Sequence, residues 1–409
     1  MLSWRSRSLC PFVSRQALRR SHNSVRLLAS PAMSAARPDV ILVGGGVMGC
    51  STALRLQREG LKTLVLERSV PGAEASSAAA GILGPGPEVG HPVARDHVGA
   101  LLKLGAWSRE LHDAQAQWLR AEHRLDIGFR RCGAMVVAFE GDDERALAEH
   151  AAALAGYPHE VLDGAGARER EPSLSGAVRA AIDMPDEAQL EPRLLLRALA
   201  LAAESAGAVF RSGAYVHEIL TEGDRVRGVR VGPETLEADH VVVAAGSWTG
   251  LVPGLELAAA GIHPVRGQVL ATQTRPPVFR RLIFGAGGYV VTRPDGRVLC
   301  GSTEERVGYR REVTFGGVRS IVDLATTLAP RLAEAPLHDH WSSFRPGTAD
   351  GLPLVGAAGP TNLWLASGHF RNGILLAPAT AELVAHGIAG VPIPADIPEH
   401  LLDPRRFAS

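Results

Sequence analysis

The sequence contains little cysteine and no excess of charge of either sign. Its four cysteines include no C-x-x-C pair, a pattern that disfavours a disulfide framework or a thiolate zinc site: Cys10, Cys50, Cys132 and Cys300. This usage is typical of a reducing compartment. The 43 basic and 43 acidic side chains balance, so the composition does not favour nucleic acid or an anionic membrane as a partner. A small-molecule partner is the better hypothesis.

Long hydrophobic runs and two common catalytic motifs are absent as well. No apolar stretch approaches the roughly 18 to 20 residues that a membrane-spanning helix needs. Neither a G-x-S-x-G elbow nor a P-loop occurs, which argues against the common hydrolase and NTPase classes. The segment "HDHW", residues 338–341, has no third ligand placed by its spacing, and we expect no metal site there.

Residues 1–37 differ in composition from the rest of the chain. Seven arginines and many serines precede the first acidic residue, Asp39, which is the composition of an organellar transit peptide. The alternative is a start codon assigned too early, because Met33 stands just ahead of the first predicted strand. We exclude residues 1–37 from the fold and expect a cytoplasmic protein, or an organellar matrix protein if the extension is a transit peptide.

A dinucleotide-binding pattern begins directly after this extension. Residues 40–43 form an apolar run suited to a buried parallel strand. Gly44, Gly46 and Gly49 follow as G-x-G-x-x-G. The first glycine permits the tight turn, the second lets a pyrophosphate approach the backbone, and the third lets the next helix pack closely on the strand.

The residues after the glycines complete a βαβ unit. Val47 and Met48 offer backbone N–H groups at the predicted helix N-terminus, where the helix dipole favours an anion. The helix is expected to end before Gly60, and a strand over residues 63–66 leads to Glu67. An acid about 20 residues after the glycines is placed to accept the hydroxyls of an unphosphorylated ribose. The unit predicts nucleotide binding.

Two later stretches are built from small residues. Ser76, Ser77 and Gly81 belong to the loop after Glu67, in "PGAEASSAAAGILGPG", where small side chains let a bulky ring lie against the backbone. The run "ADHVVVAAGSW" reads as a buried strand that ends at Gly246. A glycine at the carboxyl end of a strand is a place where a ligand approaches the backbone of an open α/β sheet.

Four stretches of the sequence resemble the FAD-dependent amine oxidases of the D-amino-acid oxidase group, and within it the glycine oxidases of thiamine biosynthesis. They are "VGGGVMG", "EASSAAAGILGP", "VVVAAGSWTG" and the long run "RPGTADGLPLVG…GHFRNGILLAPATAE". The last is the most specific, because a run of this length and composition seldom recurs by chance. The resemblance covers residues 39–390 and implies FAD held without a covalent bond.

The resemblance, with the glycine motif, implies a set of cofactor-binding residues spread along the chain: Gly44, Gly46, Val47, Met48, Gly49, Glu67, Arg68, Ala75, Ser76, Ala80, Gly81, Ile82, Val216, His369, Phe370, Arg371, Asn372, Gly373, Ile374 and Leu375. The last seven open a predicted helix. Its N-terminus would stabilise a reduced, anionic flavin.

Three residues would line the substrate position. By the resemblance, Arg345 pairs with the carboxylate of an amino acid, Tyr289 adds a hydrogen bond to that carboxylate, and Arg371 lines the same place beside the flavin. A planar guanidinium suits a carboxylate better than lysine does. Because Arg371 sits among glycines and apolar residues, it needs an anion or fixed carbonyls nearby, and we expect substrate, flavin and backbone oxygens to be its partners. An ordinary surface ion pair is the alternative for either arginine.

The predicted reaction is the oxidation of a small amino acid at its α-carbon. Hydride passes to the flavin, the imine gives an oxo acid and ammonia, and dioxygen takes the electrons to form hydrogen peroxide. No side chain is assigned as general acid or base. The preferred amine stays open between glycine, sarcosine and small D-amino acids such as D-proline. Two competing hypotheses are a dehydrogenase with a quinone acceptor and a non-catalytic FAD-binding assembly factor. A homo-oligomer is one hypothesis for the quaternary state.

The order of motifs predicts an α/β protein with a Rossmann-like FAD/NAD(P)-binding domain and an α+β substrate domain that contains an antiparallel sheet. Signatures at both ends and in the middle assign residues 38–110, 186–252 and 342–402 to the FAD-binding domain. The substrate domain is expected to comprise residues 111–185 and 253–341. Within it, "GQVLATQT", "GGYVVTRP" and "RVLCGSTEE" read as strands that roof the substrate position.

Overall fold

The apolar run Val40–Val43 forms the strand β1, as predicted, and lies inside a six-stranded sheet. The structure, a computed structural model, describes residues 37–90, 97–255 and 260–407, so the predicted extension lies outside the described residues up to residue 36. The strand order is β19 (Leu354–Ala357), β20 (Leu363–Ser367), β13 (His240–Val243), β1, β2 (Thr63–Glu67) and β9 (Val209–Ser212).

This sheet is parallel and buried on both faces. β1 pairs in parallel with β13 on one side and with β2 on the other, and within the sheet only β19 runs antiparallel to its neighbour. Val40 and Leu42 pack with helices on one face, whereas Ile41 and Val43 pack under a small antiparallel sheet on the other. Burial of both faces explains why β1 reads as a continuous apolar run and does not alternate with polar residues.

The small antiparallel sheet consists of β10 (Val216–Glu222), β11 (Arg225–Val231) and β12 (Glu234–Glu237). A short turn joins its first two strands, because β10 ends at Glu222 and β11 begins at Arg225.

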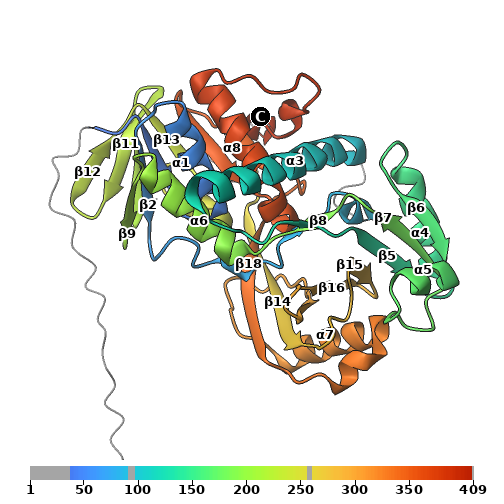
Figure 1. Ribbon diagram of the computed structural model, residues 1–409. Helices are drawn as coiled ribbons and strands as arrows, with labels where there is room; N and C mark the ends of the chain where they lie inside the picture. The colour runs from blue at the N-terminus through green and yellow to red at the C-terminus, as the bar shows by residue number, and fades with distance from the viewer. Residues whose placement is uncertain (1–36, 91–96, 256–259, 408–409) are drawn as a thin grey trace, which may run out of the picture. The chain divides into compact units, whose positions relative to one another are not determined.

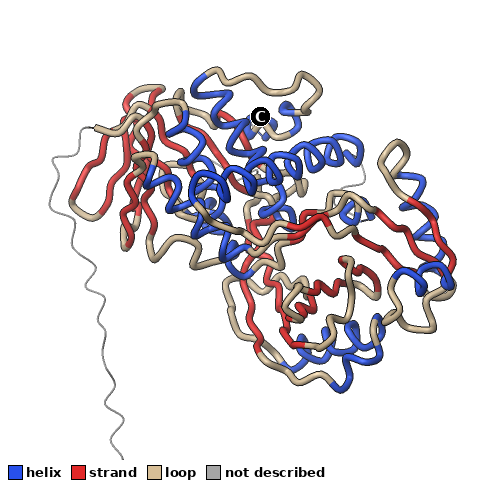
Figure 2. The backbone as a smooth tube through the Cα atoms, in the orientation of Figure 1, coloured by secondary structure: helices blue, strands red, loops and turns tan. Residues whose placement is uncertain are grey.

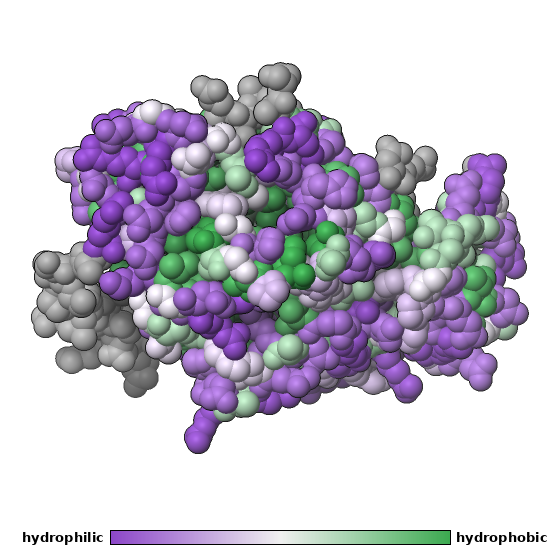
Figure 3. Space-filling model, turned by 90° about the horizontal axis from the view of Figure 1, so that it is seen from above, coloured by the Kyte–Doolittle hydropathy of each residue, from purple (hydrophilic) through white to green (hydrophobic). Residues whose placement is uncertain are grey.

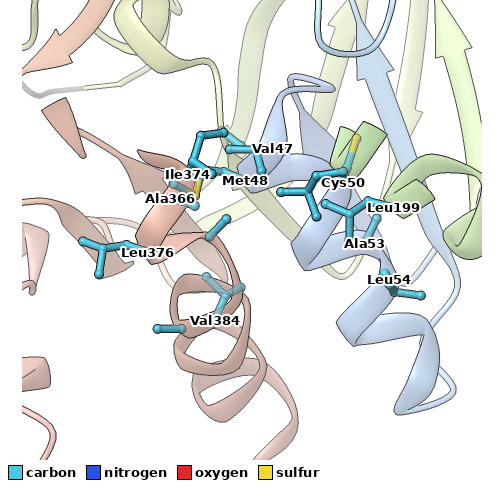
Figure 4. Close-up of a cluster of buried hydrophobic side chains, with 14 of the residues drawn as sticks. Val47, Met48, Cys50, Ala53, Leu54, Leu199, Ala366, Ile374, Leu376 and Val384 are labelled. Carbon is cyan, nitrogen blue, oxygen red and sulfur yellow. The ribbon is translucent and has the colours of Figure 1, made fainter. Parts of the chain in front are cut away.

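Four helices cover the opposite face of the parallel sheet: α1 (Val47–Arg58), α3 (Val98–His123), α6 (Pro192–Ser205) and α8 (Gly373–Ala389). α8 contacts both α1 and α3 (Figure 1). Figure 4 shows the apolar contact between α1 and α8, where Met48 and Val47 of α1 meet Ile374 of α8 and Ala366 of β20. Two segments from opposite ends of the sequence thus share one core.

A second, eight-stranded sheet is largely antiparallel. Its strand order is β18 (Asp339–Gly347), β14 (His263–Gln273), β17 (Arg297–Gly301), β16 (Gly288–Thr292), β15 (Leu282–Gly285), β5 (Ala134–Ala138), β7 (Ala180–Met184) and β6 (Glu160–Asp163). Only β15 and β5 pair in parallel within it. The strands and the helices beside them are seen in Figure 2.

Shorter elements connect and cover the two sheets. The helices are α2 (Ala75–Ala78), α4 (Asp142–Ala153), α5 (Gly164–Arg170) and α7 (Phe315–Leu328), and a three-stranded sheet has the order β3 (Ile82–Leu83), β8 (Ala188–Gln189) and β4 (Arg130–Arg131). The 3-10 helices are η1 (Pro87–Gly90), η3 (Gly246–Leu251), η4 (Pro330–Glu334), η5 (Phe370–Asn372), η6 (Glu399–Leu401) and η7 (Pro404–Phe407).

The three strands predicted for the substrate domain correspond to β14, β16 and β17. The third is shorter than expected, because β17 ends at Gly301 and residues 302–305 form a loop apart from one bridge at Glu305. The division into two domains stays a prediction. The strands of the parallel sheet all fall in the segments assigned to the FAD-binding domain, but α3 and β18 cross the predicted boundaries at 110 and 342.

On the face drawn in Figure 3, hydrophobic side chains gather between hydrophilic ones. None of the helices in the described residues combines the length and apolar character needed to cross a membrane.

Candidate functional site

A large cavity is lined by residues of both main sheets. Its wall includes the β1–α1 turn, the end of β2, residues 72–84, the segment after β13, parts of β14 and β18, and the start of α8. The empty space is about 1930 Å³ when the part open to solvent is included. The carboxyl ends of β1, β2 and β13 reach this wall, which is where ligands bind in open α/β sheets.

The backbone of the glycine motif lies at the cavity wall. Two glycines of the motif are required because a Cβ at either position would clash with backbone atoms. Gly44 has φ +110°, and a Cβ there would lie 2.5 Å from the carbonyl oxygen of Ala244. A Cβ on Gly49 would lie 1.9 Å from the carbonyl oxygen of Gly44, so Gly49 serves the close crossing of α1 over β1 and does not line the cavity. Gly46 does line it, opposite Ser76.

Glu67 marks the end of the cavity formed by β2. Its carboxylate is buried and accepts hydrogen bonds from the backbone N–H groups of Gly45 and Ser69, each at 2.8 Å. These bonds fix the carboxylate and leave further lone pairs able to accept ribose hydroxyls. The neighbouring Arg68 lies over the ring of Trp248, with 3.9 Å from guanidinium carbon to ring centroid, and pairs with Glu74.

Two helix N-termini reach the cavity without a negatively charged side chain of their own. The first turns of α1 and α8 contain no acidic residue, and neither N-cap residue, Gly46 or Asn372, forms a side-chain capping bond. The orphan N–H groups and the dipole of such ends favour an anion. Together with the glycine turn and Glu67, these ends fit the pyrophosphate, the ribose and the anionic edge of a flavin dinucleotide.

The small-residue loop forms the wall between these ends. Ala80, Gly81 and Ile82 line the cavity. A Cβ on Gly81, which has φ +72°, would lie 2.0 Å from the carbonyl oxygen of Leu190. The buried Arg293 donates to the carbonyl of Ala80 at 2.6 Å, so a guanidinium from the second sheet holds this loop in place.

Almost all of the predicted site residues meet at this one cavity. Of the residues proposed for cofactor and substrate, only Gly49 and Leu375 are absent from its wall. The side chain of Leu375 is 3% exposed and packs near Gly105 of α3, so it does not reach the wall, and a contact of Leu375 with the cofactor stays a prediction. Successive residues of a helix point about 100° apart, and Leu375 therefore turns away from the side that Ile374 presents to the cavity.

Arg345 lies on β18 at the substrate end of the cavity and is half-buried. Its Nη1 donates to the carbonyl of Thr303 at 3.0 Å and its Nη2 donates to Ser302 Oγ at 2.5 Å. Among the residues that the structure describes, no carboxylate forms an ion pair with it. Burial lowers the pKa of Arg345, and a guanidinium in this state is a ready partner for an anionic ligand.

A missing side chain makes room for this guanidinium. Gly267 of β14 lies beside Arg345, and a Cβ on Gly267 would come within 2.4 Å of both Nη atoms. Gly267 also lines the cavity. Glycine at this position therefore lets the Arg345 head lie flat against the neighbouring strand.

Arg371 lies in the same wall, but its partners differ from those expected. It forms ion pairs with Glu88, at 2.7 Å from Nε, and with Glu304. Burial lowers the pKa of Arg371, but the two carboxylates outweigh this effect and the net pKa is raised. Two acidic side chains from distant segments, which the sequence expectation did not include, therefore supply counter-charge to Arg371. Contacts of Arg371 with substrate and flavin stay a prediction.

A buried network supports the loop that carries Glu88. The Gly86 N–H donates to Glu187 at 3.0 Å, and His150 Nε2 lies 2.9 Å from the Gly86 carbonyl. Glu187 in turn accepts from Arg109 and Tyr157, each at 2.8 Å. Burial raises the pKa of Glu187 despite these donors. The network fixes the backbone two residues before Glu88.

Two further residues of the cavity wall are Tyr289, predicted to bind substrate, and His369, predicted to bind the cofactor. Tyr289 is 7% exposed and lines the cavity from β16. His369 is buried, its Nε2 lies 2.8 Å from Thr380 Oγ1, and burial lowers its pKa to about 3. The imidazole is therefore neutral near pH 7 and adds no charge to the site.

Sequence analysis did not find Glu88, Glu304, Ser302 or Gly267. Glu88 and Glu304 are 283 and 67 residues from Arg371 in the sequence, so no local spacing could pair them. The one available signal was chemical: a cation in apolar sequence requires an anion somewhere.

Comparison with known proteins agrees with this geometry. The bifunctional protein ThiO/ThiG of Trichormus variabilis is 33% identical over 85% of this chain, which covers 52% of that protein. This chain thus spans about half the length of that relative. The glycine oxidase of Pseudomonas aeruginosa is 33% identical over 90% of this chain and 98% of its own length. The crystal structure of glycine oxidase from Geobacillus kaustophilus superposes with a TM-score of 0.82 at 32% identity, over 90% of this chain and 98% of that one.

The family model described as DAO, FAD dependent oxidoreductase, matches residues 39–386. That match covers the glycine turn, Glu67, both site arginines and the start of α8, so it includes each part of the cavity wall described above. The chain belongs to the FAD dependent oxidoreductase family.

Proposed function

We propose that this FAD-dependent oxidoreductase oxidises glycine or a similar small amino acid. The observation that carries the proposal is Arg345, a guanidinium at the cavity wall that pairs with no carboxylate of the described residues. Such a charge is favourable only if a ligand supplies the anion. The relatives that bear the name glycine oxidase support an amino acid as that ligand.

In this proposal Arg345 binds the substrate carboxylate. Two of its donors are held by Thr303 and Ser302, so the guanidinium is oriented before the substrate arrives. Tyr289 adds a hydroxyl donor from β16. The substrate carboxylate would thus be fixed by Arg345 and Tyr289, with the α-carbon held inside the same cavity.

The residues at α1, β2 and α8 are proposed to hold FAD. When bound, FAD accepts a hydride from the substrate α-carbon and passes the electrons to dioxygen, which gives hydrogen peroxide. The protein supplies position and a site of low polarity. His369 is neutral and its low pKa makes it a weak base, while Glu88 is held by Arg371. We therefore assign no general base, and the substrate amine must lose its proton before the hydride leaves.

A small substrate is favoured by the way in which Arg371 is held. Glu88 and Glu304 pin its guanidinium from two sides, so it cannot swing away to admit a long side chain without breaking two ion pairs. Glycine needs no such space.

The imine product would give the oxo acid and ammonia, and we propose that it serves the thiazole branch of thiamine biosynthesis.

The remaining parts of the proposal concern partners and compartment. Substrate and dioxygen are the proposed small-molecule partners, and the protein is proposed to act in the cytoplasm, or in an organellar matrix if residues 1–37 direct it there. The domain division at residues 110, 186, 252 and 342 also stays a proposal. So does a homo-oligomer, and light scattering of the purified protein measures the quaternary state directly.

The test is to purify residues 33–409 and add glycine, sarcosine and D-proline separately to the flavoprotein under anaerobic conditions. The expected result is fastest bleaching of the flavin absorbance with glycine, followed by peroxide when air is admitted. Bleaching without peroxide would instead indicate a dehydrogenase with another acceptor. No bleaching with any amine would contradict the proposed function and favour a non-catalytic FAD-binding protein.

A further inference from the structure

The helix that reaches the flavin end of the cavity contains a proline. Pro378 lies inside α8, five residues after its start at Gly373. Proline has no N–H group, so the carbonyl of Ile374, four residues earlier, has no donor within the helix. Ile374 is buried and lines the cavity. A buried carbonyl without a partner destabilises the fold, and a donor from elsewhere is therefore required.

His112 of α3 supplies that donor. Its Nε2 lies 2.8 Å from the carbonyl oxygen of Ile374, and the side chain is fully buried. Because a carbonyl can only accept, Nε2 must carry the proton and Nδ1 must be bare. Nδ1 indeed has no hydrogen-bond partner among the described residues. Burial lowers the pKa of His112 to about 4, which agrees with a neutral ring.

Ser108, one turn earlier on α3, makes the neighbouring connection. Its hydroxyl donates to the carbonyl of Leu375 at 2.6 Å and accepts from the N–H of Ala379 at 3.3 Å. The side chain is fully buried. The hydroxyl therefore lies between Leu375 and Ala379, the pair of helical hydrogen-bonding residues that directly follows the pair Ile374 and Pro378.

Ser108 and His112 are four residues apart and so lie on one face of α3. We propose that Ser108 and His112 are positioning residues that act on the flavin through the first turn of α8. By holding two carbonyls of that turn, they keep its N–H groups directed at the cavity. The inference rests on the proposed position of the flavin ring beside the start of α8.

A measurable property follows from this arrangement. The positive end of a helix dipole stabilises an anion more than a neutral group, so a well-placed α8 favours the reduced, anionic flavin over the oxidised one. Disorder in the first turn should lower the midpoint potential of the flavin and weaken FAD binding. The midpoint potential and the FAD affinity do not depend on which amino acid the enzyme oxidises. This inference can therefore fail while the proposed substrate is correct, and the proposed substrate can be wrong while this inference holds.

The experiment uses the full holoenzyme and four variants: His112→Phe, His112→Gln, Ser108→Ala and Pro378→Ala. FAD binding is measured by ultrafiltration and fluorescence, the midpoint potential by equilibration with a reference dye, and folding by thermal melting. We expect His112→Phe to weaken FAD binding about tenfold, the size expected for one buried carbonyl left without a partner, and to shift the potential to a more negative value. Ser108→Ala should have a smaller effect of the same sign, because the Ala379 N–H can then donate directly to the Leu375 carbonyl. The glutamine amide in His112→Gln can donate to the Ile374 carbonyl in place of the imidazole, so this variant should keep much of the wild-type FAD affinity and midpoint potential.

The double variant His112→Phe/Pro378→Ala gives the sharpest result. Alanine at 378 restores the N–H that Ile374 lacks, so the effect of His112→Phe should fall to within about twofold in this background. The matched control is His386→Phe at the far end of the same helix, where Nδ1 lies 2.6 Å from the carbonyl of Val391. It removes a histidine contact with a backbone carbonyl from a part-exposed position and should leave the potential unchanged.

Three outcomes would overturn the proposal. The first is a His112→Phe protein with a lower melting temperature but wild-type FAD affinity and potential, which would make the contact merely structural. The second is an equal loss in the Pro378→Ala background, and the third is an equal shift in His386→Phe. If His112→Phe alone does not fold, the double variant decides: a folded protein with near wild-type potential supports the proposal, and an unfolded one contradicts it.

Discussion

The surroundings of Arg345 and of Arg371 differ although both arginines line one end of one cavity. Arg371 is held between Glu88 and Glu304, and its pKa is raised. Within the described residues Arg345 is hydrogen-bonded to a hydroxyl and a carbonyl and forms no ion pair, and burial lowers its pKa. The first guanidinium has two carboxylates in direct contact, whereas the second has room for the proposed substrate carboxylate. Both arginines lie in the cavity wall, so position alone does not show which one binds a ligand. The presence or absence of a carboxylate partner within the protein is the feature that distinguishes them.

The largest expected effect comes from removing the unbalanced charge. Arg345→Ala should cost about 2 to 5 kcal/mol of interaction free energy with the substrate. The value of kcat/KM for glycine should therefore fall roughly 30-fold to 4,000-fold, mainly through a higher KM, while FAD stays bound. Steady-state peroxide assays and the flavin spectrum measure both. Arg179→Ala, which removes an exposed arginine paired with Glu140, is the matched control. Unchanged kinetics in Arg345→Ala would remove this residue from the substrate site.

The two arginines should have opposite effects on stability. Arg371→Met removes the ion pairs of Arg371 with Glu88 and Glu304 and should lower the unfolding free energy by about 1 to 3 kcal/mol. Arg345→Met removes a charge that forms no ion pair with the described residues, so stability without substrate should stay equal or rise. Urea unfolding of both variants measures the difference. Equal losses in the two variants would contradict the comparison.

Displacing the Arg345 head without removing it should have a smaller effect. A Cβ on Gly267 would lie 2.4 Å from both Nη atoms, so Gly267→Ala should raise KM for glycine about tenfold, near 1.4 kcal/mol, with little change in FAD binding. Gly316→Ala is the control, because nothing lies within 4 Å of a Cβ at that position. A KM equal to that of the control would show that the guanidinium has room to shift.

His369 extends the comparison to a group that can give up its charge. Like the half-buried Arg345, the buried His369 forms no ion pair with a carboxylate of the described residues, but its pKa falls to about 3, against about 6.5 in an unfolded chain. Below pH 6.5 the unfolded chain binds a proton that the folded protein does not, so the unfolding free energy should fall as the pH is lowered from 7 to 4. His369→Asn should show a shallower loss of melting temperature between pH 7 and pH 5. An unchanged slope would show that His369 does not contribute.

Much of the nucleotide half of the molecule could be predicted from sequence. The β1–α1–β2 unit follows local rules: an apolar strand, glycines at fixed spacing, and an acid at the end of the next strand. Gly44, Gly46 and Glu67 therefore lie at the cavity as expected. Such features are readable because their physical causes lie within about 30 consecutive residues.

The substrate end was less accessible to sequence reasoning. Arg345 and Tyr289 were found only through resemblance to a family, and Glu88 and Glu304 were not found at all. The partners of Arg371 come from segments far along the chain, and nothing local in those segments marks them. The early end of β17 at Gly301 has a similar origin, since Ser302 and Thr303 turn aside to hold Arg345. Tertiary contacts decided each of these features.

The strand order of the parallel sheet also has a consequence for biosynthesis. β1 pairs with β13, β13 pairs with β20, and α8 covers α1. The N-terminal unit is finished by residue 67, but its neighbours continue to residue 367 and beyond. At about 5 to 20 residues per second, a ribosome needs roughly 15 to 60 s to make the intervening chain. During that time α1 can pack against α6, which is complete at Ser205, but not against α8, so the side of α1 that meets α8 stays uncovered until synthesis is nearly finished.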